Sequence, residues 1–296
     1  MTFPNFIFGG AGKSGTTSLY HALKQHPQVF ASPRKEPMFF SFVDREPAEI
    51  PPEDRPGYEV AVKTQSEYEA LFAGTERFIA RGEASQRYFS DAYALAKIAD
   101  TIPHVKLIFF LRNPIERAWS HFVHFRRDER EASPTLLGAL EGSIPQSHIY
   151  TRTGFYAEWL DRWRERFNAD QMYVGLFDDF RADAERACQE VYEFLGVDRS
   201  FAPDTGLHAN ISGMPRNWAA REALRGANRV RFILKRYAPG MDRSWMHRTY
   251  TSVFRRLLVR PTMDAATREY LLTLYEDDIR RLETILCRDL SHWRAG

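Results

Sequence analysis

The sequence predicts an α/β fold, in which helices cover both faces of a central parallel sheet. Two segments indicate this arrangement. Residues 6–8 form an apolar strand that leads through a glycine-rich turn into a helix. Residues 106–111 form a continuous apolar run, which is typical of a strand buried on both faces. Strands that alternate with helical crossovers favour parallel pairing, so we expect a three-layer sandwich.

The bulk properties are those of an ordinary globular protein. The 296 residues can bury one large core, and we expect a single domain over residues 1–296, with residues 216–296 as a largely helical C-terminal extension. The net charge of +2 gives no case for nucleic-acid binding. No basic residue precedes the apolar start, and no stretch approaches the ~20 apolar residues of a membrane span. We therefore expect a soluble, cytoplasmic protein, in which Cys188 and Cys287 stay reduced.

The first half of the chain alternates strands and helices. In chain order we expect a helix to about residue 26, a strand at 29–31, a loop at 32–37, an apolar segment at 38–42, a surface loop at 46–57, a helix at 65–72 and a short strand at 77–83. The surface loop is predicted because that segment is rich in proline and acidic residues.

The strand at 106–111 leads into a helix that we expect to run to about residue 130. Asn113 can cap this helix, and Pro114 fits its first turn. Its predicted buried stripe contains Ile115, Ala118, Trp119 and Phe122. Its predicted polar face contains Arg117, Ser120, His121 and His124. Further along we expect a helix at 154–167, a strand at 172–177, a helix at 182–195 that ends at Gly196, and a final helix at 265–287.

The glycine-rich turn after the first strand predicts an anion site. Glycines allow the backbone N–H groups to face an anion, and the following helix adds its positive N-terminal end. Lys13 adds a full positive charge, and we expect further donors at Ser14, Gly15, Thr16 and Thr17. The alternative is a plain tight connection between strand and helix. The ordered set of strand, glycines, lysine, paired threonines and helix favours a P-loop-like socket for a phosphate or a similar dianion.

The turn does not match the loop of nucleotide triphosphatases. In the pattern G-x-x-x-x-G-K-[ST], the first glycine would fall on Ile7. A triphosphate enzyme also holds magnesium, usually with an aspartate at the end of another strand. The strand at 106–111 ends instead at Arg112. Two strand ends thus supply positive charge directly, which suits a phosphorylated ligand bound without a metal.

Two segments of the chain resemble motifs of the sulfotransferases that use 3′-phosphoadenosine 5′-phosphosulfate (PAPS), most closely the heparan-sulfate-type enzymes and their bacterial relatives. Gly12-Lys-Ser-Gly-Thr-Thr17 is similar to the 5′-phosphosulfate loop of that family. Leu111-Arg-Asn-Pro-Ile-Glu-Arg-Ala-Trp-Ser-His-Phe122 is similar to its 3′-phosphate element. The resemblance implies that Arg112 and Ser120 hold the 3′-phosphate of the donor.

Three further segments are similar to the same family. Glu36-Pro-Met-Phe-Phe40 resembles the segment with the catalytic glutamate, and Gly82-Glu-Ala-Ser-Gln-Arg-Tyr-Phe89 resembles the next block. Asn210-Ile-Ser-Gly-Met-Pro-Arg216 resembles a late loop that closes over the nucleotide, which implies nucleotide contacts at Gly213 and Arg216.

The chain also departs from the family pattern. The glycan enzymes usually carry a lysine where this chain has Ala84, and the late loop lacks their Lys-Gly-Arg pattern. These departures concern substrate contacts and closure over the nucleotide, and both phosphate elements are unaffected. The resemblance is good over residues 5–216 and looser beyond them.

The resemblance implies a reaction without a metal, in which fixed cations stabilise the leaving group, adenosine 3′,5′-bisphosphate (PAP). Lys13 is the expected contact of the bridging oxygen, and Glu36 is the expected base for the acceptor. Glu83 and the histidines of the 114–130 helix are alternative bases. Arg112 has an alternative too, an ion pair with Glu83 or Glu116.

Residues 216–260 form a strongly basic segment. It contains Arg216, Arg221, Arg225, Arg229, Arg231, Lys235, Arg236, Arg243, Arg248, Arg255, Arg256 and Arg260. Only Glu222 and Asp242 oppose these charges. The segment suits contact with an anionic acceptor or an anionic surface, and a basic helical face paired with acids elsewhere is an equal alternative.

The sequence therefore predicts a PAPS-dependent sulfotransferase that acts on a hydroxyl, less favourably an amine, of a sugar, lipid or secondary metabolite. A small-molecule kinase with an atypical phosphate loop is an alternative enzyme. A nucleotide-binding or polyanion-binding module without activity is an alternative outside the enzymes, because a fold alone does not fix function. The acceptor, which is a small molecule or a glycan, and the oligomeric state are not predicted.

Overall fold

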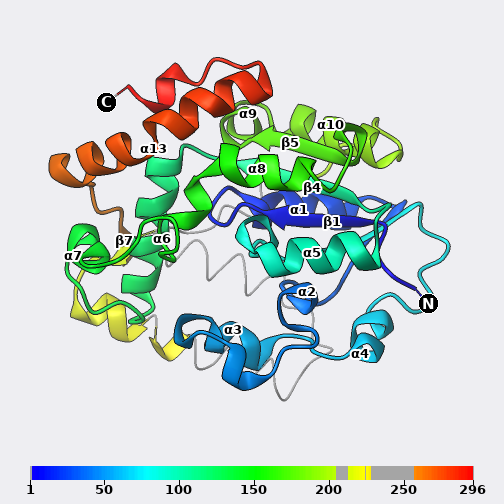
Figure 1. Cartoon of the computed structure of the whole chain (residues 1–296), viewed down its shortest axis with the longest axis horizontal. Helices are drawn as coiled ribbons and strands as arrows, with labels where there is room; N and C mark the ends of the chain where they lie inside the picture. Colours follow the sequence, from blue (N-terminus) through cyan, green and yellow to red (C-terminus); the bar gives the residue numbers. More distant parts are fainter. Residues whose placement is uncertain (1, 205–212, 224, 228–256, 296) are drawn as a thin grey trace.

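The computed structural model describes residues 2–204, 213–223, 225–227 and 257–295 (Figure 1). Residues 210–212 of the late loop lie outside this part. Residues 224 and 228–256 of the basic segment lie outside it as well, and with them eight of its Arg and Lys residues: Arg229, Arg231, Lys235, Arg236, Arg243, Arg248, Arg255 and Arg256.

Five parallel strands form the central sheet, which confirms the predicted α/β class. Their order across the sheet is β2 (Val29–Ala31), β3 (Ala80–Ala84), β1 (Phe6–Gly10), β4 (Lys106–Leu111) and β5 (Met172–Leu176). From β1 the chain goes two positions out to β2 and returns to β3, which lies between β2 and β1. It then passes β1 and continues with β4 and β5 on the other side of the sheet. Because all five strands are parallel, their carboxyl ends lie at one edge of the sheet.

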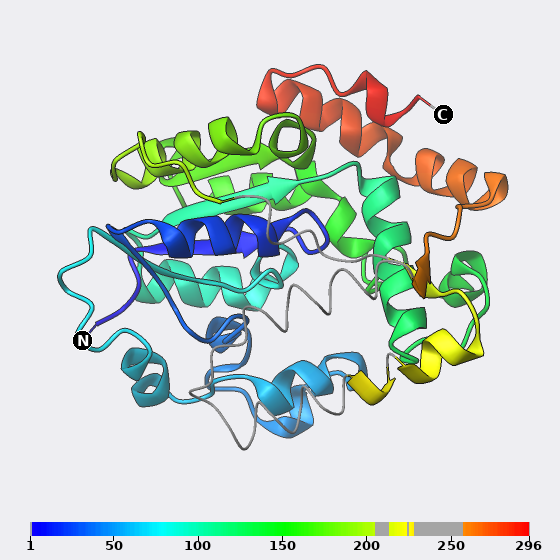
Figure 2. The same cartoon turned by 180° about the vertical axis from the view of Figure 1, so that it is seen from behind.

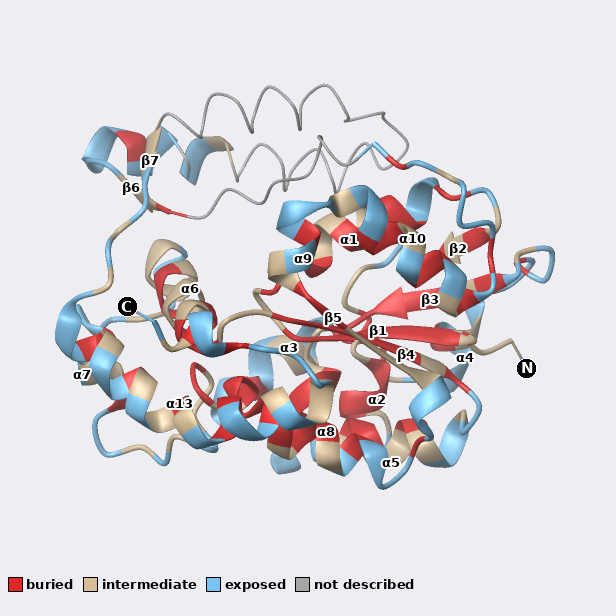
Figure 3. Ribbon diagram, turned by 90° about the horizontal axis from the view of Figure 1, so that it is seen from above, coloured by how far each residue is buried: buried red, intermediate tan, exposed pale blue. Residues whose placement is uncertain are grey.

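Helices cover both faces of the sheet and complete the predicted three layers (Figure 3). One face packs against α1 (Thr16–Gln25) and α10 (Ala184–Leu195). The other face packs against α5 (Ala92–Thr101) and α8 (Tyr156–Arg164). Each face of the sheet has its own hydrophobic core, and successive residues of the buried strands point into opposite cores. Phe8 and Phe110 lie in the core with α1, whereas Ile7 and Phe109 lie in the core with α5.

The remaining elements extend this frame. They are α2 (Phe39–Phe42), α3 (Arg55–Val60), α4 (Gln65–Ala70), α6 (Pro114–Arg127), α7 (Leu136–Leu140), α9 (Phe177–Ala182) and α13 (Ala265–Leu286), with the antiparallel pair β6 (Met214–Pro215) and β7 (Leu258–Val259). The last helix, α13, packs against α6 and α8 (Figures 1 and 2). The C-terminal part of the chain thereby supports the helix that follows β4.

Local signals set several helix ends where the sequence predicted them. The Asn113 side chain accepts a hydrogen bond from the Ile115 N–H at 3.0 Å, and Pro114 opens α6. Gly196 ends α10 in the left-handed conformation. The predicted helix at 154–167 is shorter, because α8 begins at Tyr156 after a 3₁₀ turn at Arg152–Gly154.

The structure corrects several details of the predicted local structure. Residues 46–57 are not a plain loop, because they contain two 3₁₀ turns and the start of α3. The strand expected at 77–83 lies at Ala80–Ala84, and the segment 92–101 that was not assigned is α5. In α6, Trp119 is only partly buried. Arg117 was placed on the polar face but is only 1% exposed, because its Nη2 donates to the Tyr150 carbonyl inside the protein.

Candidate active site

The residues singled out in the sequence gather at the carboxyl ends of four neighbouring strands. Lys13 follows β1, and Arg112 follows β4. Glu36 follows β2, and Glu83 lies in β3 just before its end. Ligands of open parallel sheets bind beyond this edge, so the sheet order itself brings the four side chains to one region.

The loop after β1 depends on its glycines for two different reasons. Gly15 caps α1 with a φ of 81°, and a Cβ there would lie 2.6 Å from the ring of Phe177. A Cβ on Gly10 would lie 2.7 Å from the carbonyl oxygen of Gln86. The turn after β3 therefore packs directly on this loop, and only glycine fits at these two positions.

Lys13 is a cation in mostly cationic surroundings. Within the described ranges it forms no salt bridge with a carboxylate, although its side chain is half-buried. Burial, together with the guanidinium groups of Arg127 and Arg112, lowers the pKa of Lys13 to about 8, although Asp128 opposes this shift. A half-buried cation beside two other cations indicates a site for an anion, because an approaching negative charge offsets the unfavourable interactions.

Arg112 lies directly beside the loop that carries Lys13. Its Nη1 donates to the Lys13 carbonyl at 3.4 Å, and its Nη2 lies 3.7 Å from Glu116 Oε2. The alternative pairing with Glu116 is thus present as a long contact, and Arg112 is 25% exposed. Burial lowers the pKa of Arg112, and Glu116 opposes this shift. Ser120 is half-buried in α6, the helix that starts after Arg112.

The first turn of α1 supplies the hydroxyl groups predicted for an anion socket. Ser14 and Thr16 are buried, whereas Thr17 is half-buried. Thr17 has a partner that the sequence did not suggest, because Lys35 Nζ donates to its Oγ1 at 2.6 Å. Lys35 lies in the loop after β2, so no pattern along the chain links it to Thr17.

The Glu36 carboxylate is held at one oxygen and unpaired at the other. Its Oε2 accepts a hydrogen bond from the Gln86 N–H at 3.0 Å. Its Oε1 is buried and has no hydrogen-bond partner among the described residues. Burial raises the pKa of Glu36 to about 7, against the opposing effects of Lys35 and the Gln86 N–H. A carboxylate in this state has a free acceptor atom and an affinity for protons suited to a base near neutral pH.

Glu83 is more enclosed than Glu36. It is 0% exposed, and it accepts hydrogen bonds from Ser85 Oγ at 2.7 Å and from the Tyr68 hydroxyl at 3.2 Å. Burial raises the pKa of Glu83 to about 8, and the nearby Glu36 adds to this rise. Since both carboxylate oxygens already have donors inside the core, the geometry favours Glu36 over Glu83 as the group that meets an acceptor.

The two candidate histidines lie on α6 in different surroundings. His121 packs edge-on against Phe125 and Tyr150, and burial lowers its pKa well below the usual value. His124 contacts Arg127 Nη2 at 2.6 Å through Nδ1, and burial together with Lys13 lowers its pKa to about 4. Both are therefore neutral at pH 7, and each is already packed against or bonded to α6 neighbours.

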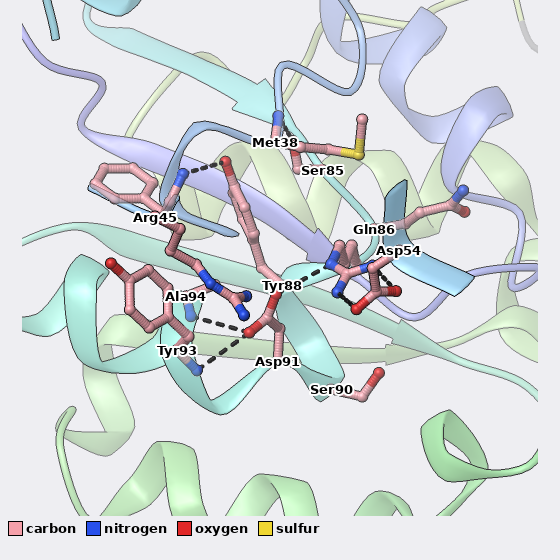
Figure 4. A network of polar contacts seen from close by, with 12 residues as sticks. Met38, Arg45, Asp54, Ser85, Gln86, Tyr88, Ser90, Asp91, Tyr93 and Ala94 are labelled. Carbon is pink, nitrogen blue, oxygen red and sulfur yellow. Dashed lines mark hydrogen bonds and ion pairs between the residues drawn. The ribbon is translucent and has the colours of Figure 1, made fainter. Parts of the chain in front are cut away.

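A network of ion pairs and hydrogen bonds surrounds the turn after β3, which contains Ser85 and Gln86 (Figure 4). Arg87 donates to Asp54 Oδ1 at 2.6 Å and to Asp91 Oδ2 at 3.1 Å. Asp91 in turn caps α5, whereas Asp54 belongs to the segment between β2 and β3. Ser85 Oγ accepts the Met38 N–H at 3.0 Å. These contacts fasten the chain that follows Glu36 to the turn after β3.

The late loop is only partly described. Gly213 is buried with a φ of 152°, and β6 beside it contacts α6. The Arg216 N–H donates to the Leu257 carbonyl at 3.0 Å, but the Arg216 side chain is exposed. In the described ranges, no hydrogen bond or ion pair joins Arg216 to the loop after β1. Its assignment as a nucleotide contact therefore stays a prediction.

Two kinds of feature are absent from the described residues. No cluster of three or more His, Cys, Asp or Glu side chains gathers there at metal-binding distances. No helix there is long and apolar enough to cross a membrane.

Comparison with known proteins agrees with the resemblance noted in the sequence. A model described as "Sulfotransferase family" matches residues 4–202. The chain is 27% identical over 203 residues to the mouse bifunctional heparan sulfate N-deacetylase/N-sulfotransferase 4, which covers 66% of this chain and 22% of that protein. It is 27% identical over 169 residues to the membrane-associated sulfotransferase kil1 of Dictyostelium discoideum, which covers 56% of this chain and 32% of that protein. The chain thus spans a fifth to a third of the length of these curated relatives.

A solved structure matches nearly the whole chain. The crystal structure of a sulfotransferase from Alicyclobacillus acidocaldarius superposes with a TM-score of 0.71 at 28% identity. The match covers 99% of this chain and 100% of that one. The fold therefore extends beyond the residues that the family model matches.

Proposed function

The chain belongs to the sulfotransferase family, and from this premise we propose that it transfers the sulfuryl group of PAPS to a hydroxyl group of a small molecule or a glycan. The observation that supports this most strongly is the pairing of two opposite groups at one sheet edge. Lys13 is a half-buried cation without an acid partner among the described residues, and Glu36 Oε1 is a buried acceptor without a donor. A sulfuryl transfer uses a cation beside the oxygen that leaves the sulfur and a proton acceptor beside the hydroxyl that attacks it.

The proposed reaction is a single displacement at sulfur. The acceptor oxygen forms a bond to the sulfur while the bond from the sulfur to the 5′-phosphate oxygen breaks. The electron pair of the broken bond leaves with PAP, and the acceptor proton moves to a base. No redox change occurs, and the sulfuryl group keeps its three terminal oxygens.

Lys13 and Arg112 are proposed to act on the donor side. The leaving oxygen gains negative charge as its bond to sulfur breaks, and a fixed ammonium group there lowers the barrier. Lys13 has that role, with the donors of Ser14, Gly15, Thr16 and Thr17 around the 5′-phosphosulfate. Arg112 can bind the 3′-phosphate through two N–H groups, and Ser120 adds a hydroxyl. Fixed cations of this kind supply the stabilisation without a metal.

Glu36 is proposed to act on the acceptor side. A general base must reach the proton that it removes and must be ionised at the working pH. Its pKa of about 7 means that it is about half ionised near neutral pH. The hydrogen bond from Gln86 holds Oε2 in place, which leaves Oε1 free to accept the proton of the acceptor hydroxyl.

The acceptor class stays open between a sugar, a lipid and a secondary metabolite. Oxygen is favoured over nitrogen because a hydroxyl needs the deprotonation that a carboxylate supplies, whereas a free amine does not. The heparan sulfate N-sulfotransferases named above are much longer than this chain, so their acceptor is not carried over. Arg216 and Gly213, with the basic segment 216–260, are proposed to close the nucleotide site or receive an anionic acceptor.

A thermal-shift measurement tests the proposal against its rivals. We expect PAP to raise the melting temperature in the presence of a chelator, and ATP with magnesium to raise it much less. A preference for ATP with magnesium would favour the kinase alternative. Stabilisation by PAP with no turnover of PAPS, across a panel of phenol, sugar and amine acceptors, would favour the binding-module alternative.

A further inference from the structure

Lys35 is a lysine of the candidate site to which the proposed reaction has so far assigned no role. Its Nζ donates to Thr17 Oγ1 at 2.6 Å. Thr17 belongs to the first turn of α1, where the 5′-phosphosulfate is expected to bind. Lys35 therefore reaches from the loop after β2 across to the loop after β1, which carries Lys13.

Lys35 and Glu36 are adjacent in the chain, but their side chains contact residues that follow different strands. Lys35 contacts Thr17 beyond β1, whereas Glu36 contacts Gln86 beyond β3. Glu36 has a φ of 58°, a left-handed conformation that non-glycine residues rarely adopt. Such a conformation persists only where the surroundings impose it, and it is commonly found at functional sites.

The charge of Lys35 is available for a ligand. Lys35 is half-buried, and burial lowers its pKa while the adjacent Glu36 raises it. In the described part of the chain, Lys35 forms no salt bridge with a carboxylate, and its hydroxyl partner Thr17 is uncharged. An ammonium group carries three N–H donors, so two remain after the bond to Thr17.

We propose that Lys35 is a second sulfuryl-binding cation, which contacts the terminal oxygens of the transferring group on the side of Glu36. Lys13 then meets the oxygen that leaves, and Lys35 meets the oxygens that stay on the sulfur. The inference rests on the proposed sulfuryl transfer and assigns the donor contacts within it. Lys35 contacts Thr17 and is adjacent to Glu36 in the chain, and this distinguishes its role from that of Lys13.

This assignment predicts that Lys35 distinguishes PAPS from PAP, which lacks the sulfuryl group. In Lys35→Met, the dissociation constant for PAP should stay within about 2-fold of the wild-type value. The dissociation constant for PAPS should rise about 10-fold, as expected for one charge-assisted hydrogen bond. Lys24→Met is the matched control, because Lys24 is an exposed lysine at the end of α1 and its loss removes the same charge.

Turnover supplies a second readout that a purely structural role would not move. Hydrolysis of PAPS, with water in place of the unidentified acceptor, should slow about 100-fold in Lys35→Met. Among the described residues, the charged and polar groups that interact with Glu36 are Lys35, Glu83, the Tyr20 hydroxyl and the Gln86 N–H. Loss of Lys35 removes the one cation among them, so the acidic limb of the rate–pH profile should move to higher pH. Lys35→Arg should restore most of the preference for PAPS.

The outcomes separate this inference from the proposed function. Suppose that the wild-type protein binds PAP and hydrolyses PAPS, and that Lys35→Met keeps the wild-type ratio of the dissociation constants for PAPS and PAP. Lys35 then does not contact the sulfuryl group, and the inference is wrong. An equal loss for PAP and PAPS also overturns it, because it indicates a tether between the loops. If the wild-type protein binds neither nucleotide, the proposed function fails and this assignment fails with it.

Discussion

The candidate site has a cationic half, formed by Lys13 and Arg112, and an acidic half, formed by Glu36 and Glu83. The cationic half follows β1 and β4, and the acidic half lies at the ends of β2 and β3. Each half is partly or fully buried, and burial disfavours the charged form of any group. The pKa of Lys13 is therefore lowered to about 8, and the pKa of Glu36 is raised to about 7.

This difference teaches that burial at one sheet edge shifts the pKa values of a lysine and of a carboxyl in opposite directions. The pKa of Lys13 falls and that of Glu36 rises, so the two values lie close together. An anionic donor restores the full charge of Lys13, because it supplies the counter-charge that the apo site lacks. Glu36 has no such partner among the described groups except Lys35, so it keeps its affinity for a proton.

The largest effect is expected from Lys13→Met, which removes the central charge of the cationic half. Turnover of PAPS should fall at least about 10³-fold, since the leaving oxygen loses its cation. The stabilisation by PAP in a thermal-shift measurement should also be reduced. Wild-type turnover in this variant would place the leaving-group contact elsewhere.

The next largest effect is expected from Glu36→Gln, which keeps the shape of the acidic half and removes its base. Turnover should fall about 10²-fold or more, while the affinity for PAP stays unchanged. Calorimetry with PAP and a turnover assay with PAPS measure the two quantities separately. If turnover persists at the wild-type rate, the base is another group, and Glu83→Gln becomes the variant to test.

A smaller effect is expected from Arg112→Ala. Loss of a two-point contact with the 3′-phosphate should weaken PAP binding about 10- to 100-fold. Adenosine 5′-phosphosulfate, which lacks the 3′-phosphate, should bind the variant and the wild type about equally. Glu116→Gln is the control, because it removes the 3.7 Å ionic neighbour of Arg112 and should not weaken PAP binding. A loss of affinity for both nucleotides in Arg112→Ala would contradict this assignment.

The pH dependence of PAP binding tests the state of Lys13 directly. Lys13 titrates at about 8 in the free protein. Bound phosphate raises that value, so binding at pH 8 should take up a fraction of a proton, and affinity should fall as the pH rises above 8. Calorimetry in buffers of different ionisation enthalpy measures this uptake. It should disappear in Lys13→Met and persist in Lys24→Met.

The smallest effect is expected from Glu83→Gln, on stability alone. The pKa of Glu83 is raised to about 8 in the folded protein, so folding favours the protonated carboxyl. Its contribution to stability is full below about pH 4.5 and declines as the pH rises toward 8. A neutral glutamine removes this decline, so the melting temperature of the variant relative to the wild type should increase from pH 5 to pH 8. A flat difference over that range would mean that Glu83 is ionised inside the core.

Much of the fold could be predicted from the sequence because its signals are local. The apolar run at Lys106–Leu111 forms β4 as expected, and Asn113 with Pro114 begins α6. The position of β3 was shifted by a few residues, because Arg81 interrupts its apolar pattern. Arg117 was misplaced for a similar reason, since periodicity treats every arginine as a surface residue, whereas the carbonyl that receives Arg117 comes from Tyr150.

The sequence by itself determined the α/β class, the glycine-containing loop at Gly12–Thr17 between β1 and α1, and the positive strand end at Arg112, because each depends on neighbours along the chain. Only the tertiary structure decided that Lys35 reaches Thr17, that Gln86 holds Glu36, and that Arg87 fastens the segment behind it. These contacts join residues that follow different strands. They depend on the order β2-β3-β1-β4 in the sheet, which long-range packing sets and no local pattern contains.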